Sequence, residues 1–235
     1  MLFRSDPRED ESPVWHPDGA RVTFAATRDG GRQTLMKAAD GSGEDVRIFD
    51  HGTSGHQHVG SWSPDGRVLA ITANRSAGPD IFTIAAGEKP SLKPFVQTAF
   101  TEQAPMFSPD GKWIAYMSDE SGRTEIFVQP FPGPGGKRQV STEGGFEPAW
   151  NRNGRELFYR VGNRMMVVPV TLTPTFSADA PRVLFEGRFA KIGWGERDYD
   201  VAPDGSRFLM ISAPEDRSRA ELNVVLHWSE ELRKN

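Results

Sequence analysis

Short apolar segments alternate with turns along the chain, and this pattern predicts β-strands. The stretch FSPDGKWIAYMSDESG, Phe107–Gly122, contains a tight turn at Ser108–Gly111 between two such segments. KWIAYMS has the β-branched and aromatic content and the length of a strand, and the segments TEIFVQPF and RQVST follow it. Pro105 and Pro109 keep the segment before the turn from forming a helix. Together these segments predict a four-stranded antiparallel meander of about 45 residues.

The same turn recurs along the chain with similar neighbours. Besides the turn after Phe107, WHPDG begins at Trp15, WSPDG at Trp62, WNRNG at Trp150 and VAPDG at Val201. The five positions are 47, 45, 43 and 51 residues apart, and a period of about 20–50 residues is typical of repeat architectures. A unit of four short strands has the size of a propeller blade. We therefore expect an all-β beta-propeller that forms one domain over residues 1–235.

The two ends of the chain bear on the number of blades. The fifth repeat supplies three strands, in RDYDVAP, SRFLMIS and ELNVVLHW, and lacks a fourth. A spare strand, LFRS at Leu2–Ser5, lies where a fourth strand would precede Trp15. We expect five four-stranded blades closed into a ring by this N-terminal strand, because closure hides the sheet edges. The alternative is a fragment of a six-bladed or larger propeller.

Two kinds of recurring residue are explained by structure rather than by chemistry. The aromatic residue before the turn is expected to pack between neighbouring blades, at Trp15, Trp62, Phe107 and Trp150, with Val201 in the same place in the last repeat. The turn aspartates, Asp18, Asp65, Asp110 and Asp204, stand singly, without the run of oxygen ligands of a calcium loop. Asn153 takes the same position in the fourth repeat, which favours turn chemistry over calcium binding.

Composition excludes several classes of protein. The chain of 235 residues has a net charge of -4 and a pI near 5.8. It therefore lacks the excess of basic residues that is typical of a nucleic-acid-binding protein. The absence of cysteine excludes disulfides, thiol catalysis and thiolate metal sites. No apolar run reaches the roughly 18 residues of a membrane span, and MLFRSDPRED lacks the apolar stretch of a signal peptide. As it stands the sequence predicts a cytoplasmic protein.

Two levels of resemblance follow from the repeated motif. WSPDGRVLAI and FSPDGKWIAYMSDESG resemble the TolB-like, WD-repeat-like propeller repeat. The stretch from Phe107 to Leu232 is similar to the C-terminal propeller of bacterial eukaryotic-like serine/threonine protein kinases, whose propellers often have six or more blades. That resemblance implies a sensory or protein-binding module, lying in the periplasm or otherwise outside the cytoplasm if the chain is a fragment of a membrane-anchored kinase. The chain itself has no Gly-rich phosphate loop and no His-Arg-Asp catalytic loop.

A propeller places the start of each innermost strand at one mouth of its channel, which locates a candidate site. The residues four positions before the recurring aromatic are Glu11, His58, Gln103, Phe146 and Arg197. The next positions are Ser12, Val59, Ala104, Glu147 and Asp198. We expect a polar ligand-binding ring of Glu11, His58, Gln103, Glu147, Arg197 and Asp198. The loops between second and third strands should lie on the same face. The alternative is a hydrated channel with a polar lining.

The segment HGTSGHQH raises the question of a metal site. His56 and His58 are two residues apart, so on a strand they would face one side, and imidazole suits zinc, copper or nickel. A catalytic zinc site needs a third protein ligand, for which His51 and Glu11 are candidates. The alternative is a solvated loop between blades. We assign no metal and no cofactor to the chain.

These observations favour a non-catalytic binding or sensor module that recognises a protein or small ligand and is associated with a kinase. We expect a monomer. No GxSxG elbow occurs, which weighs against a serine hydrolase. One alternative is a metal-assisted hydrolase of the lactonase, esterase or glycosidase type in the channel. A second is a carbohydrate-binding propeller with inter-blade pockets, although Trp113, Trp194 and Trp228 do not recur at one blade position.

Overall fold

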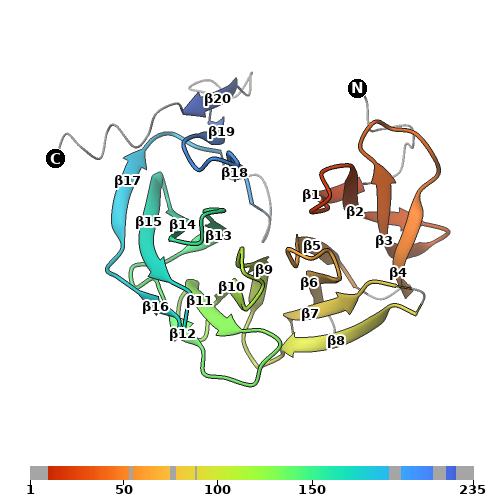
Figure 1. Ribbon diagram of the computed structural model, residues 1–235, viewed down its shortest axis with the longest axis horizontal. Helices are drawn as coiled ribbons and strands as arrows, with labels where there is room; N and C mark the ends of the chain where they lie inside the picture. Colours follow the sequence, from red (N-terminus) through yellow and green to blue (C-terminus); the bar gives the residue numbers. More distant parts are fainter. Residues whose placement is uncertain are drawn as a thin grey trace. The chain divides into compact units, whose positions relative to one another are not determined.

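The computed structural model describes residues 10–52, 55–74, 78–87, 89–190, 197–213 and 221–225. All regular elements in these ranges are β-strands, as Figure 1 shows. None of the described residues forms a helix that is long and apolar enough to cross a membrane. The chain divides into two compact units, Met1–Phe107 and Ser108–Asn235, which are described in turn. The single domain expected over residues 1–235 stays a prediction.

The first unit contains two four-stranded antiparallel sheets and one further strand. The first sheet follows the chain in the order β1 (Asp10–Trp15), β2 (Arg21–Arg28), β3 (Gly31–Ala38) and β4 (Val46–Gly52). The second has the same topology in β5 (Gln57–Trp62), β6 (Val68–Asn74), β7 (Pro79–Ala85) and β8 (Ser91–Val96). The strand β9 (Glu102–Phe107) packs against β5, β6 and β7. Both sheets confirm the predicted four-stranded meander.

The second unit contains three antiparallel groups of strands. The first is β10 (Trp113–Ser118), β11 (Glu125–Pro130) and β12 (Arg138–Gln139). The second comprises β13 (Phe146–Trp150), β14 (Glu156–Val161), β15 (Arg164–Thr171), β16 (Ser177–Ala178) and β17 (Arg182–Glu186). The third is β18 (Tyr199–Val201), β19 (Phe208–Ser212) and β20 (Glu221–Val225). The four strands predicted for the third repeat are therefore present as β9 to β12.

The fourth repeat differs from the four-strand template at its outer edge. Two strands pair with β15 on the same side: β16 with its end, through Thr171 and Ser177, and β17 with its beginning, through Arg164 and Glu186. The fifth repeat has three strands in the described part of the chain, as its sequence predicts. The closing strand expected at Leu2–Ser5 lies outside the described residues, so the closed five-bladed ring stays a prediction.

In the second and third repeats, one hydroxyl and one carboxylate hold the turn. Ser63 Oγ donates to Asp65 Oδ1 at 2.6 Å and accepts the amide of Val68 at 2.9 Å. Gly66 completes the turn at φ 69°, a conformation that glycine adopts without steric cost. The hydrogen bond from Ser63 holds the pKa of Asp65 below its ordinary value. These contacts confirm that the turn aspartate has a local structural role.

The recurring aromatic residue is buried in the second, third and fourth repeats, and Val201, which takes its place in the fifth, is half-buried. Trp62 donates its indole N–H to Thr23 Oγ1 of the first sheet at 3.0 Å, and the amide of Phe107 donates to Ser61 Oγ at 2.7 Å. Trp150 is also buried. Trp15 is 59% exposed, so its expected burial is wrong. Trp62 thus contacts the first sheet through its side chain, and Phe107 contacts the second sheet through its backbone amide.

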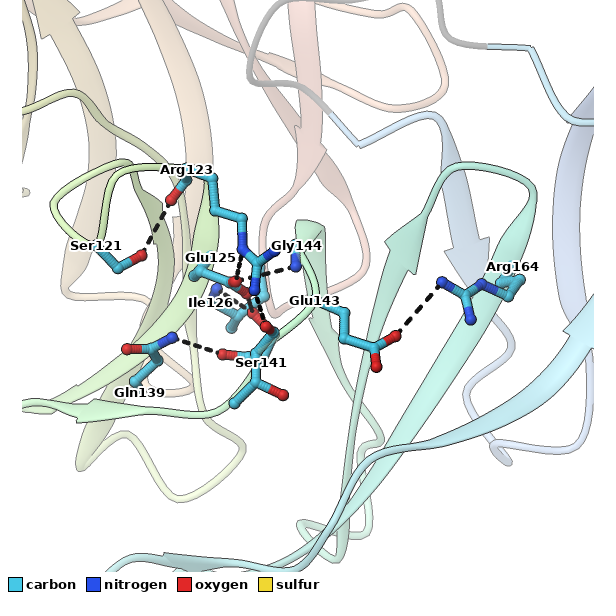
Figure 2. Close-up of polar contacts among 10 residues, drawn as sticks. Ser121, Arg123, Glu125, Ile126, Gln139, Ser141, Glu143, Gly144 and Arg164 are labelled. Atoms are coloured by element: carbon cyan, nitrogen blue, oxygen red, sulfur yellow. Dashed lines mark hydrogen bonds and ion pairs between the residues drawn. The ribbon is translucent and has the colours of Figure 1, made fainter.

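A buried carboxylate ties β11 to the connection that leads to β13 (Figure 2). Glu125 is 1% exposed and accepts hydrogen bonds from Arg123 Nε at 2.7 Å and from the amide of Gly144 at 2.9 Å. Ser141 Oγ also donates to Glu125 and accepts the amide of Ile126 at 2.7 Å. Buried carboxylates are stable only when their oxygens are satisfied in this way.

Glu125→Ala is expected to destabilise the protein by about 3 kcal/mol, because it leaves buried donors without an acceptor. Glu143→Ala is the matched control. Glu143 is exposed, and its Oε2 lies 3.7 Å from Arg164 Nη2 in a surface ion pair (Figure 2). Its expected effect is within about 0.5 kcal/mol. Urea unfolding of the three proteins measures both. Equal effects of the two substitutions would contradict a structural role for the Glu125 network.

Candidate functional site

The innermost strands begin with irregular pairing at the positions expected to carry the site. The register shifts between Glu11 and Val14 in β1 and between Phe146 and Ala149 in β13. Ser12, Ala104 and Glu147 have φ of 53°, 54° and 58°. These residues occupy the same position in their repeats, three before the aromatic. Bulges redirect side chains, and left-handed non-glycine residues carry strain that often marks functional positions.

In the first unit, the structure links the candidate residues of the first and second repeats. Ser12 Oγ lies 3.2 Å from His58 Nδ1. Glu11 Oε2 accepts a hydrogen bond from Arg32 Nη2 at 3.0 Å, and Arg32 also donates to Thr27 Oγ1 at 3.1 Å. Glu11 and His58 are half-buried, so their side chains remain partly accessible to a ligand.

Gln103, the third candidate in this unit, lies in β9 beside the left-handed residue Ala104 and is half-buried. The amide of Ala104 donates to Thr72 Oγ1 at 3.2 Å. This contact fixes the backbone of β9 against β6. Gln103 is therefore presented from a fixed position in the strand.

In the second unit, the structure brings Glu147 and Asp198 together around a buried arginine. Arg160 Nη1 donates to Glu147 Oε2 at 3.3 Å and to the carbonyl of Ala190 at 3.0 Å. The amide of Asp198 donates to the same Glu147 oxygen at 3.3 Å, and Tyr199 Oη donates to the Glu147 carbonyl at 2.8 Å. We name Glu147, Arg160, Asp198 and Tyr199 the buried acidic network.

Burial dominates the electrostatics of this network. Glu147, Arg160 and Asp198 are 4%, 5% and 8% exposed. Burial raises the pKa of Glu147 above its ordinary value, and Asp198 raises it further, while Arg160 acts in the opposite direction. Burial also raises the pKa of Tyr199, which keeps its hydroxyl available as a donor. The network therefore holds a carboxyl group whose ionised form is disfavoured by its surroundings.

Arg197 lies next to this network in sequence but is directed elsewhere. Its guanidinium pairs with Asp200 Oδ1 at 2.9 Å and donates from Nε to the carbonyl of Tyr199 at 2.9 Å. The guanidinium carbon also lies 5.8 Å from the centre of the Tyr199 ring. Arg197 is half-buried, so it is the more accessible of the predicted site residues in this unit. The complete six-residue ring remains a prediction, with three members in each unit.

The histidine segment is divided among different environments. His51 is buried, with Nε2 3.0 Å from Thr34 Oγ1 and its ring 4.8 Å from that of Phe49. His56 is exposed, and His58 contacts Ser12. Within the described ranges no group of three histidine or carboxylate side chains is placed to hold a metal. His56 and His58 therefore have no third ligand in that part of the chain.

Sequence analysis missed the two arginines that organise these contacts. Arg160 stands inside the apolar strand sequence ELFYRV, and Arg32 is the second residue of β3. A charge inside an apolar strand is a detectable signal, because such a residue needs a buried partner. The sequence does not identify that partner, since Glu147 is 13 residues from Arg160 and Asp198 a further 38 along the chain.

Ala104→Val is expected to destabilise the protein by about 2 kcal/mol or more, because a β-branched residue is strained at φ 54°. Ala104→Gly should change stability by less than about 1 kcal/mol, since relief of strain offsets the lost methyl and the added chain freedom. Val59 occupies the same position in the second repeat without a positive φ. Urea unfolding of both variants checks the expectation, and equal losses would contradict it.

Glu147→Gln tests the raised pKa of Glu147. A carboxyl group with a raised folded pKa contributes stability at low pH and loses it as pH rises through that folded value. The unfolding free energy of wild type relative to Glu147→Gln is therefore expected to fall as pH increases above 4.5, the ordinary pKa. Unfolding between about pH 4 and pH 8 measures it. A difference that grows with pH would show that Arg160 outweighs burial.

Three known proteins resemble this chain. Dipeptidyl-peptidase 5 from Trichophyton equinum is 35% identical over 89 residues, which are 36% of this chain and 12% of that protein. The crystal structure of TolB from Acinetobacter baumannii superposes with a TM-score of 0.75 at 16% identity, over 96% of this chain and 53% of that chain. An oligogalacturonate lyase in complex with manganese has a TM-score of 0.65 at 13% identity, over 95% of this chain and 67% of that chain. At these identities the two structures show a shared fold.

A family model, the TolB beta propeller domain, matches residues 47–225. This range includes the second to fifth repeats and most of the chain. The four-stranded antiparallel sheets and the structural similarity to TolB agree with it. They bear out the propeller fold expected from the repeated turn. The chain belongs to the TolB beta propeller domain family.

Proposed function

We propose that this chain is a non-catalytic binding or sensor module that recognises a protein or small ligand at the starts of its innermost strands. The observation that carries the proposal is the shared placement of Glu11, His58, Gln103 and Arg197. The first three lie four positions before the recurring aromatic, and Arg197 lies four positions before Val201, which takes its place; each is half-buried. Polar side chains that are held by the backbone and still accessible are suited to recognition.

The six predicted residues divide into contact and supporting roles. Glu147 and Asp198 are buried in the acidic network, so they support the backbone from which Arg197 projects. Glu11 is neutralised by Arg32, and Arg197 by Asp200. The accessible members therefore offer directional hydrogen bonds with little net charge. A ligand with matched donors and acceptors suits these side chains better than a highly charged one.

The kinase association is part of the same proposal. It rests on the similarity of the stretch from Phe107 to Leu232 to the C-terminal propellers of bacterial eukaryotic-like kinases. In such a protein, a propeller that binds a ligand would act as the sensory part of the longer chain. A metal-assisted hydrolase is the competing function. The similar proteins include a peptidase and a lyase, so the experiment also tests for catalysis.

Arg197→Ala combined with Gln103→Ala is expected to abolish capture of the specific partner from a lysate of the source organism, or to abolish the thermal shift caused by a small ligand. Removing two hydrogen-bonding side chains should weaken binding at least about tenfold. Arg67→Ala is the control. Arg67 is exposed and lies in the hairpin turn between β5 and β6, at the end of β5 away from His58. Quantitative mass spectrometry and a thermal-shift ligand panel provide the readouts.

The proposal fails if the double variant and the control retain the same partners and ligands as wild type. An activity panel of esters, lactones and glycosides, with zinc or manganese added, tests the competing function. Turnover that depends on the metal and is lost in His58→Ala would establish a hydrolase instead. The unfolding midpoint of each variant is measured as well. Only variants with the midpoint of wild type are compared, so loss of folding is not mistaken for loss of binding.

A further inference from the structure

The second unit contains a hollow at the hairpin-turn ends of its strands. The cavity has a volume of ≈ 710 Å³, within the range of about 300–1,000 Å³ that ligand pockets occupy. Its walls are the turn before β10, the turn between β13 and β14, and the segment that joins β15 to β16. Its polar lining includes Asp110, Asn153, Arg155, Thr171, Ser177 and Asp179.

One wall of this cavity is fixed by aromatic packing. The Trp113 indole N–H donates to the carbonyl of Leu172 at 3.0 Å. Phe176 is 3% exposed, and its ring lies 5.4 Å from that of Trp113 and 6.3 Å from that of Trp150. The contacts of Trp113 with Leu172 and Phe176 therefore fix the segment between β15 and β16. Thr171 and Ser177, at its two ends, are exposed. A wall held in place in the free protein lowers the ordering cost of binding.

A substitution inside the repeated turn leaves Arg155 unpaired. In the second repeat Arg67 lies 4.0 Å from the turn carboxylate of Asp65. In the fourth repeat Asn153 takes the place of the aspartate, and its amide oxygen accepts the amide of Arg155 at 2.8 Å. The turn is preserved, but the neighbouring negative charge is gone. The Arg155 guanidinium has no ion pair or hydrogen bond with any residue that the structure describes.

The two carboxylates of the cavity differ in their contacts. Asp110 uses Oδ1 for the turn, where it accepts from Ser108 and from the amide of Lys112. Asp179 is exposed, and its carboxylate has no described partner. The guanidinium supplies donors, the carboxylates supply acceptors, and hydroxyls supply both. The cavity thus presents an unpaired donor group and two carboxylate groups that are not bound to each other.

We propose that this cavity binds a neutral oligosaccharide. Each sugar hydroxyl both donates and accepts, so one ligand can satisfy Arg155 and the carboxylates of Asp110 and Asp179 together. The lining carries two carboxylates and one guanidinium, so a ligand of either charge would be attracted by one kind of group and repelled by the other. Pro109, Pro169 and Leu172 add apolar surface to the lining, which suits the C–H faces of sugar rings.

This site is separate from the proposed recognition surface. Within the second unit, Glu147 lies near the start of β13, whereas Asn153 and Arg155 lie in the turn after the end of that strand. Substitutions in the cavity should therefore leave partner binding at Arg197 unchanged. Failure of one proposal does not imply failure of the other.

Asn153→Asp is the sharpest test, because aspartate is the turn residue of the other four repeats. It should preserve the turn while giving Arg155 a neighbouring carboxylate, as in the Asp65–Arg67 pair. Titration calorimetry uses maltotriose, cellotriose and chitotriose as neutral probes, trigalacturonate as the anionic probe and trialanine as the peptide probe. We expect saturable binding of at least one neutral trisaccharide at millimolar concentration or below.

Arg155→Ala and Asn153→Asp should each weaken that binding at least about tenfold, the effect of losing a hydrogen bond to a charged group. Arg67→Ala should leave it unchanged. Unfolding midpoints of all variants establish that the fold is retained. The proposal is overturned if no neutral trisaccharide binds, if both cavity variants bind as wild type does, or if only trigalacturonate or trialanine binds.

Discussion

The packing of one repeat on the next is the constraint on which this structure depends. A sheet of four short strands has two faces and too little area to bury a core alone. Trp62 therefore packs against the first sheet and donates its indole N–H to Thr23, and the backbone amide of Phe107 donates to Ser61 of the second sheet.

The innermost strands are irregular at the end away from the aromatic residue. The strands begin with bulges and with left-handed residues at Ser12, Ala104 and Glu147. The strained backbone is compensated by specific contacts, such as the hydrogen bond from Tyr199 to the Glu147 carbonyl. Side chains beside these positions are consequently presented at fixed places, which is the property that a recognition surface requires.

The repeated turn shows how an invariant backbone can carry different chemistry. Ser63 and Asp65 satisfy the turn amides locally, and Asn153 does the same with an amide oxygen. Exchanging a carboxylate for an amide leaves the turn intact and changes the charge around the next arginine. The charge at a turn therefore depends on the residues in which the repeats differ, and not on the residues that they share.

The sequence by itself determined the strands, the turns and the repeat, because these depend on local alternation and on turn chemistry. It also predicted Glu147 and Asp198 as members of a polar ring, from their position three residues before Trp150 and Val201. Only the tertiary structure decided that Arg160 joins them, that Arg32 neutralises Glu11, and that β16 and β17 share the edge of β15. Such contacts join residues far apart in the chain, and their energy depends on burial and distance. Neither quantity is encoded in local sequence, so the buried acidic network required the folded protein.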